Sequence, residues 1–186
     1  YELKPLVTSN EALMIRTENE GEYFFIQHNS SSNNVYDNYL GREDYVNRNP
    51  LNDIVVFHID SSDNVVNGVK SKDRWKLSGT AANRVNQVAS HPCFRIIRAV
   101  NRDETSQGYW PFPGRGSVNE LTPITNTDFA PWNSSVPPHG RYITQISQGS
   151  NGMILKVEMP TGALVKGTVK NSRGELIPNA TIVLTK

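Results

Sequence analysis

His58 and Asp60 are the first residues of this 186-residue chain whose types and spacing could do chemistry. They are two positions apart, so on a strand both side chains would share one face. The pair could bind a metal or act as an acid–base pair. It could also form a network at the end of a strand, in which Asp60 caps a turn and His58 bonds neighbouring backbone. We favour the network.

His91 and Cys93 form a second group of reactive types, on either side of Pro92. The proline holds His91 extended, and across strands His91 could approach His58. The candidate metal ligands are therefore His58, Asp60 and His91. We nevertheless expect that this chain binds no metal. Cys93 could be a nucleophile, but no catalytic signature surrounds it. A buried residue entering a strand is the favoured interpretation, and one cysteine allows no intramolecular disulfide.

Carboxylates and aromatic side chains in the loops supply further candidates. Six loop carboxylates could offer oxygen atoms to calcium, but no spacing matches a calcium-binding loop, so solvated side chains are favoured: Asp37, Glu43, Asp44, Asp60, Asp63 and Asp73. Four aromatic residues in or beside the proline-rich stretch 101–140 could stack on a sugar or peptide: Tyr109, Trp110, Phe112 and Trp132. Packing against the core is the favoured role for these rings.

Strands must position these residues, because apolar and β-branched runs are frequent and helical periodicity is scarce. The strongest runs are 12–16, 23–28, 53–60, 94–100, 141–146 and 153–158. The continuous apolar run 54–57 predicts a strand buried on both faces, and 80–88 predicts a short helix. The predicted fold is all-β and mostly antiparallel. It is a sandwich or curved sheet with long irregular loops and at most short helices.

Charge and composition exclude some function classes. The net charge is +1 and no basic stripe is present, so no nucleic-acid partner is expected. No run of about 18 apolar residues predicts a transmembrane segment. Abundant Asn, Ser and Thr suit an exported protein that is secreted, on the cell surface or periplasmic. The chain starts at Tyr1 without a signal-peptide pattern, so we expect a processed product or an expressed segment.

Six short motifs, in order, carry a resemblance to a known family. They are EALMI with GEYFFI (11–15, 21–26), IVVFHID (54–60), NRVN (83–86), HP with FRIIRA (91–92, 94–99), PFPG (111–114), and Trp132 with ITQI (143–146). In this order they resemble the immune inhibitor A-type (thuringilysin-like) zinc metallopeptidases. The resemblance covers residues 1–160. The chain departs from the family pattern at 27–29, at 100 and at Trp110, which puts any ion or salt bridge of the relatives at these positions in doubt.

The resemblance also implies what this chain lacks. Members of that family bind catalytic zinc with a helix that carries His-Glu-x-x-His. None of His28, His58, His91 and His139 belongs to such a motif. In relatives the motif lies upstream of the matching passage. The resemblance therefore implies that this chain has no catalytic residues and no cofactor of its own. It also implies that the chain is part of a larger bacterial protein, which binds zinc and for which calcium is a second candidate ion.

The last residues resemble a different module. VKGTV (165–169) and IPNATIVL (177–184), with Gly174 between them, are similar to the opening of a carboxypeptidase regulatory-like β-sandwich domain. A domain needs more residues than 161–186 provide. The expected organisation is therefore a β-rich domain over 1–160 and the truncated start of a second domain over 161–186.

Two functions remain open from the sequence. The first is a supporting or substrate-presenting segment of a larger secreted zinc metallopeptidase, with the upstream peptidase domain and a protein or peptide substrate as its partners. The alternative is a stand-alone extracellular β module that binds glycan or protein through the aromatic residues at 109–132. Burial of those rings would favour the first, and a large exposed aromatic patch would favour the second.

Overall fold

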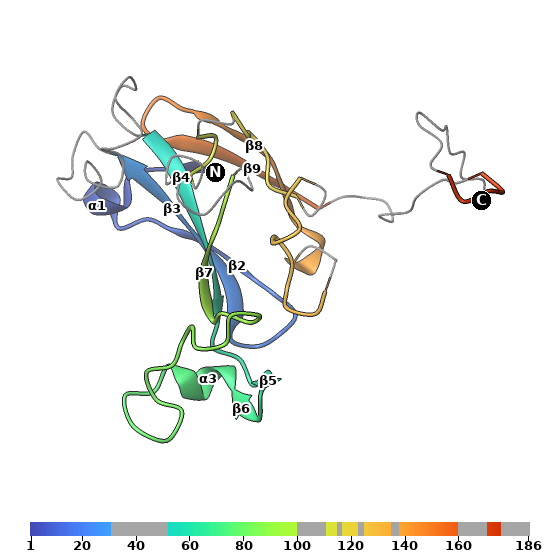
Figure 1. The fold of residues 1–186 in the computed structure, drawn as a ribbon. Coiled ribbons are helices and arrows are strands. Elements are labelled where there is room, and N and C mark those ends of the chain that lie inside the picture. The colour runs from blue at the N-terminus through green and yellow to red at the C-terminus, as the bar shows by residue number, and fades with distance from the viewer. Residues whose placement is uncertain are drawn as a thin grey trace, which may run out of the picture.

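The computed structural model describes residues 1–30, 52–99, 111–114, 117–122, 125–134, 138–159 and 171–175. In these residues the protein is mostly antiparallel sheet, with two short α-helices and one 3-10 turn (Figure 1). The all-β prediction is therefore confirmed. No helix in the described ranges has the length and apolar character that crossing a membrane requires.

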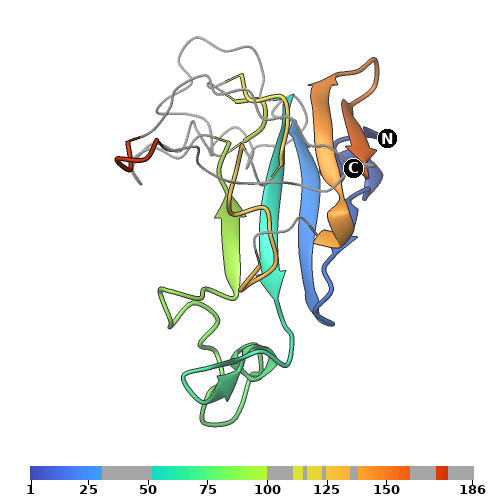
Figure 2. The same ribbon diagram turned by 90° about the vertical axis from the view of Figure 1, so that its right-hand side faces the viewer.

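Four strands form the larger sheet, in the order β2-β3-β4-β7. They are β2 (Leu13–Arg16), β3 (Glu22–Ser30), β4 (Asn52–Asp60) and β7 (Phe94–Ile97). Each neighbouring pair is antiparallel, and Figure 2 shows β7, β4 and β3 side by side. The four matching strand predictions are confirmed. The turn between β2 and β3 requires Gly21, whose φ is +87° and whose Cβ would lie 2.7 Å from the Ser61 carbonyl oxygen.

Three strands form the smaller sheet, in the order β1-β9-β8. They are β1 (Glu2–Leu3), β8 (Tyr142–Gln148) and β9 (Met153–Glu158). The predicted hairpin between β8 and β9 is confirmed, and the amide of Gly149 closes its loop on the carbonyl of Gly152 at 2.8 Å. Helix α1 (Leu6–Ser9) connects β1 to β2, and the 3-10 turn η2 (Pro138–Gly140) precedes β8.

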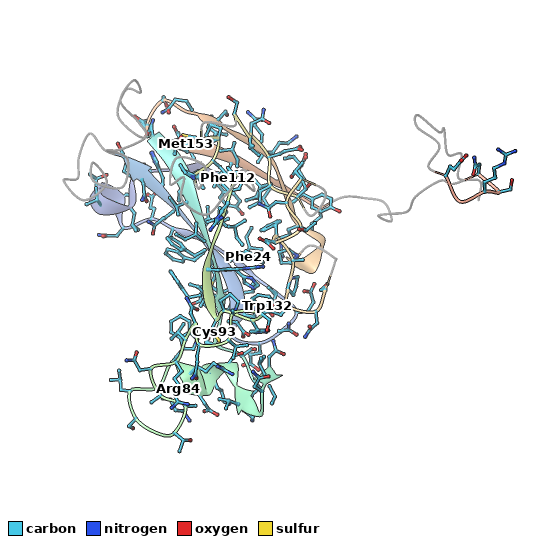
Figure 3. The ribbon with its side chains drawn as sticks, in the orientation of Figure 1. Phe24, Arg84, Cys93, Phe112, Trp132 and Met153 are labelled. Atoms are coloured by element: carbon cyan, nitrogen blue, oxygen red, sulfur yellow. The ribbon has the colours of Figure 1, made fainter. Side chains whose placement is uncertain are left out.

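The two sheets enclose one apolar core, which makes the domain a sandwich. Residues of both inner faces and of the loops after β7 contribute to it: Phe24, Ile26, Ile54 and Val56 from the larger sheet, Ile143, Ile146, Met153 and Leu155 from the smaller one, and Phe112, Leu121 and Phe129 from the loops. Figure 3 shows Met153, Phe112 and Phe24 one below another along the sandwich.

The central strand β4 is buried on one face, so the prediction of burial on both faces is wrong. Ile54, Val56, His58 and Asp60 are buried, whereas Val55, Phe57 and Ile59 are only partly covered. The second sheet packs against one side of β4. On the other side Phe57 stacks on Phe94 of the adjacent strand, with ring centroids 5.3 Å apart. Successive residues of the apolar run therefore alternate between the core and the half-covered outer face of the sheet.

The segment between β4 and β7 extends beyond the end of the larger sheet (Figure 1). It contains the ribbon of β5 (Val65–Val66) and β6 (Val69–Lys70), followed by helix α3 (Ser71–Arg74). The helix predicted over 80–88 is wrong, because these residues form turns. Asn83 has a φ of 54°, and its amide bonds the Lys76 carbonyl, which is incompatible with helical hydrogen bonding there.

The tail predictions fall mostly outside the described residues. These are the strands at 163–169 and 177–184 and the domain boundary at 160–162. The predicted turn at 171–174 is present, because the Gly174 amide bonds the Asn171 carbonyl at 2.9 Å.

Candidate functional site: a buried histidine–carboxylate cluster

The register of the larger sheet gathers polar side chains at one end of its inner face. Phe24 pairs with His58 and Glu22 with Asp60 across β3 and β4, and His58 pairs with Arg95 across β4 and β7. The loops add His91 and Trp132, the latter lying near the end of the sheet (Figure 3). We call the following set the His–Trp cluster: Glu22, His58, Asp60, His91, Arg95 and Trp132.

Asp60 is the anchor of the segment that leaves the sheet after β4. Its side chain is fully buried and accepts four hydrogen bonds. Oδ1 accepts from the amide and hydroxyl of Ser62, at 2.9 and 2.5 Å. Oδ2 accepts from the Ser71 hydroxyl and bonds Nε2 of His91, both at 2.7 Å. Burial by itself would raise the pKa of Asp60, but the bonds from Ser62, His91 and Ser71 lower it below its ordinary value.

Asp60, Ser71 and His91 have the residue types of a hydrolytic triad but not its order. In a triad the histidine lies between the carboxylate and the hydroxyl, so that it can take the hydroxyl proton. Here the carboxylate of Asp60 lies between Ser71 and His91. His91 therefore does not contact the Ser71 hydroxyl through Nε2, and the arrangement joins elements instead of activating a nucleophile.

Glu22 forms a second buried pair with His58. Nε2 of His58 lies 2.7 Å from Oε1 of Glu22, and both side chains are buried. The same oxygen accepts the Trp132 amide at 2.8 Å, and Oε2 accepts from Asn19. The carboxylate thus joins the β2–β3 turn, β4 and the Trp132 loop, which are distant in sequence.

His58 is a neutral imidazole in this setting. Burial lowers its pKa, and the nearby Arg95 charge acts in the same direction, whereas the Glu22 carboxylate opposes the shift. The Arg95 guanidinium approaches Nδ1 at 3.4 Å, which makes Nδ1 the acceptor and Nε2 the protonated donor to Glu22. Because both ring nitrogens have partners, His58 offers no lone pair to a metal.

Trp132 packs against both histidines and against Arg95. Its ring centroid is 5.2 Å from that of His58 and 4.1 Å from that of His91, with stacked planes. The Arg95 guanidinium carbon lies 4.4 Å from the ring centroid. Arg95 also pairs with Asp128 at 3.1 Å, and burial lowers its pKa while Asp128 opposes that shift. His58 and His91 therefore meet through the Trp132 ring.

Stability should depend on pH through His58. Because its pKa is lower in the folded state than the ordinary 6.5, the unfolded chain binds the proton first on acidification. The free energy of unfolding should therefore be fully retained above pH 6.5. It should fall toward the folded pKa with a slope of up to about 1.4 kcal/mol per pH unit. Asp60, whose folded pKa is also lowered, adds a further loss below about pH 4.

Urea unfolding at intervals from pH 8 to pH 4 measures this dependence. The His58→Gln variant keeps a donor for Glu22 but does not titrate, so its curve should be flatter between pH 7 and pH 5. An identical slope in the variant and the original protein would contradict the assignment of His58 as a neutral buried group.

Cys93 is buried, as the favoured interpretation expected. Burial raises the pKa of its thiol, and the adjacent Ser71 and Arg74 oppose that shift only in part. A thiol held protonated is a poor nucleophile. We expect a disulfide reagent to modify Cys93 at least about 100-fold more slowly in the native protein than in urea, since reaction requires opening of the structure. Equal rates would contradict this burial.

The remaining predicted site residues are distributed across the molecule. His28 is buried, with Nδ1 2.9 Å from the Leu3 carbonyl and Nε2 bonded to Asn52. Phe112 is fully buried. The described part gives no side-chain position for His139 and does not include Tyr109, Trp110, Asp37, Glu43 or Asp44. Asp63 and Asp73 form ion pairs with exposed lysines.

The candidate metal ligands are bonded to other protein groups in this structure. In the described ranges no three His, Cys, Asp or Glu side chains are grouped so that they could hold an ion. Of the candidate ligands, His91 and Asp60 bond each other, whereas His58 bonds Glu22. The favoured strand-end network is what the structure shows for Asp60, but His58 bonds a carboxylate instead of backbone.

Three residues of the site were missed in the sequence: Glu22, Arg95 and Asp128. Alternation could have indicated two of them. Glu22 has the same parity as Phe24 and Ile26, and Arg95 has the same parity as Ile97, so each shares a face with core residues. Asp128 lies in a loop, and no pattern pointed to its contact with Arg95.

No family model, curated protein or solved structure matches this chain. What can be said of its function therefore depends on the ordered motifs and on the geometry of the His–Trp cluster.

Proposed function

We propose that this chain is a non-catalytic supporting segment of a larger secreted zinc metallopeptidase. The observation that carries the proposal is where the family-like motifs lie in the fold. The six residues of the His–Trp cluster come from four motifs of the resemblance, which hold Glu22, His58 with Asp60, His91 with Arg95, and Trp132. Motifs that fold together as one unit are expected to bring their residues into contact in this way.

The chemistry of the cluster supports a structural role. Both carboxylates are buried and are bonded to histidine, serine, asparagine or backbone donors. Catalysis requires a base or nucleophile that can reach a substrate. His58 has partners at both nitrogens, and Cys93 is a buried thiol of raised pKa. We assign this chain no catalytic residue, and we place the zinc chemistry in an upstream peptidase domain.

The aromatic residues bear on the alternative of a glycan- or protein-binding module. Phe112 is fully buried, and Trp132 packs against His58, His91 and Arg95. Two of the four candidate rings therefore contribute to packing, which favours the supporting role.

The native polypeptide from the protein's source tests the proposal. Antibodies against this chain should isolate a polypeptide well above 20.8 kDa, whose upstream peptides include His-Glu-x-x-His. That polypeptide should cleave casein in a chelator-sensitive manner, and the 186-residue chain alone should not. A native mass near 20.8 kDa, or cleavage by this chain alone, would overturn the proposal.

A further inference from the structure

A surface groove of about 680 Å³ lies between the two sheets at the β2 edge. Its walls are all of β2, Val157 and Met159 at the end of β9, and the side chains of Tyr1 and Arg141. Tyr1, Met14 and Met159 are exposed, at 76%, 48% and 65%. The groove therefore combines apolar side chains with two arginines, Arg16 and Arg141.

The β2 strand presents unpaired backbone groups on this side. The amide of Thr17 bonds the Glu22 carbonyl at 3.1 Å, and hydrogen-bonded pairs recur at every second residue of an antiparallel ladder. Ile15 and Leu13 therefore direct their backbone groups to β3. Met14 and Arg16 direct theirs outward, and β2 has no neighbour there among the described strands.

Two other strand edges in the described ranges, those of β7 and β8, have local cover. On β7, the Asn86 side chain accepts the Phe94 amide, and the Asn126 side chain donates to the Arg98 carbonyl just beyond the strand. On β8, Leu121 pairs with Ile143, and the Ile146 amide bonds the Asn119 carbonyl. The 3-10 turn η2 lies close to β2, but in the described part of the chain no hydrogen bond outside the sheet reaches the backbone of Met14 or Arg16. The edge of β2 can therefore accept another strand.

The charges of the groove indicate which kind of ligand it would bind. Neither Arg16 nor Arg141 has an ion-pair partner in the described part of the chain, whereas Lys4, Lys70, Lys72, Lys76, Arg95 and Lys156 all have carboxylate partners there. Two unpaired guanidinium groups beside an open strand edge suit a ligand that brings carboxylates.

We propose that this groove binds an extended, carboxylate-bearing peptide segment of a partner protein, which adds as a strand to the free edge of β2. Backbone hydrogen bonds to Met14 and Arg16 supply affinity, and alternate side chains meet the apolar wall and the two arginines. The site does not depend on the proposed role in a peptidase.

Two other occupants fit the charges less well. A second copy pairing through β2 would bring two Arg16-bearing strands together without an acidic residue in either, and like charges across strands are unfavourable. Residues 161–186 contain four basic residues and one acidic residue, so they share the sign of the groove. A short, charged edge strand can also simply prevent aggregation, and the test below includes that outcome.

Fluorescence anisotropy with three labelled octapeptides tests the proposal on the full chain. In the first peptide Val and Glu alternate. In the second Lys replaces Glu, and in the third every backbone amide of the first is N-methylated. We expect saturable binding of the first at low salt and at least about tenfold weaker binding of the second. The third should not bind, because it has no amide donors for β2. Amide resonances of Met14 and Arg16 should shift most.

Charge reversal supplies the matched controls. The double variant Arg16→Glu/Arg141→Glu should weaken binding of the first peptide at least about tenfold. Arg84→Glu, an exposed reversal in the segment beyond the sheet (Figure 3), should change it less than about twofold. Circular dichroism checks that each variant is folded.

Several results would overturn the proposal. They are absence of binding by the first peptide, equal binding of the Glu and Lys peptides, equal binding of the methylated peptide, and equal effects of the two charge reversals. Self-association in sedimentation experiments without peptide binding would show that a second copy covers the edge, which also overturns it. None of these results affects the proteolysis test above, so the two proposals fail separately.

Discussion

Replacing Asp60 with alanine is expected to lower the free energy of unfolding by about 3–5 kcal/mol. The substitution leaves His91, Ser71 and Ser62 without their shared acceptor in a buried site. It also detaches helix α3 and the His91 segment from the end of β4. Urea unfolding followed by tryptophan fluorescence at pH 7 measures the change. A loss of this size is a large part of the total stability of an ordinary domain.

Two companion variants make this result interpretable. Asp63→Ala removes an exposed carboxylate that pairs only with lysines, so it should cost less than about 1 kcal/mol. Asp60→Asn keeps the volume and one acceptor oxygen, so it should fall between the two and remain folded if Asp60→Ala does not. Equal stability of the Asp60→Ala and Asp63→Ala variants would refute the anchoring role of Asp60.

Replacing Phe112 with alanine should cost about 3–5 kcal/mol, the range for a fully buried phenylalanine. The ring belongs to the core, and the backbone of Phe112 exchanges two hydrogen bonds with Ile54, at 2.7 and 2.8 Å. The truncation therefore leaves a cavity beside the central strand. Thermal and urea unfolding both report this loss.

An exposed residue provides the contrast for Phe112. Leu77 is 99% exposed, so Leu77→Ala should change stability by less than about 0.5 kcal/mol. If Phe112→Ala were equally mild but abolished binding to a glycan or peptide, the ring would be a recognition residue and the binding-module alternative would gain support. The burial of Phe112 makes destabilisation the expected outcome.

The His–Trp cluster shows why residue types alone do not define an active site. It contains two histidine–carboxylate pairs, and with its partner Ser71 it has the serine, histidine and aspartate of a hydrolase. Its carboxylates and histidines nevertheless use their hydrogen bonds to join elements of the fold, because a buried polar group is costly unless it is bonded. Nε of Arg95 and Nε1 of Trp132 are the exceptions in the described part of the cluster, since both are buried without a partner. Function is thus better sought at exposed features such as the β2 edge than at the most chemically suggestive residues.

Local patterns in the sequence were sufficient to predict the longer strands, but not the two-residue strands β1, β5 and β6. Apolar and β-branched runs predicted β2, β3, β4 and β7, and a Ser/Gly/Asn loop between two such runs predicted the β8–β9 hairpin. The parity of His58 and Asp60 was likewise readable, as was the burial of Cys93. Each of these properties depends on neighbours only a few residues away.

The pairing of those strands was decided by the tertiary structure. Glu22 meets His58 from a position 36 residues away, and its carboxylate accepts the Trp132 amide from 110 residues away. Such contacts depend on the register of β3 against β4 and of β4 against β7, which no local pattern specifies. The helix predicted at 80–88 is absent for the same reason. Hydrogen bonds to the Arg74 and Lys76 carbonyls override a weak local preference for helix. The sequence by itself therefore determined where the longer strands lie, but not which faces of β4 are buried. The packing of the two sheets decided which charged groups lie together at the buried end of the sandwich, and it leaves β2 at an edge of the larger sheet among the described strands. Both outcomes depend on contacts between distant segments, which local sequence patterns do not specify.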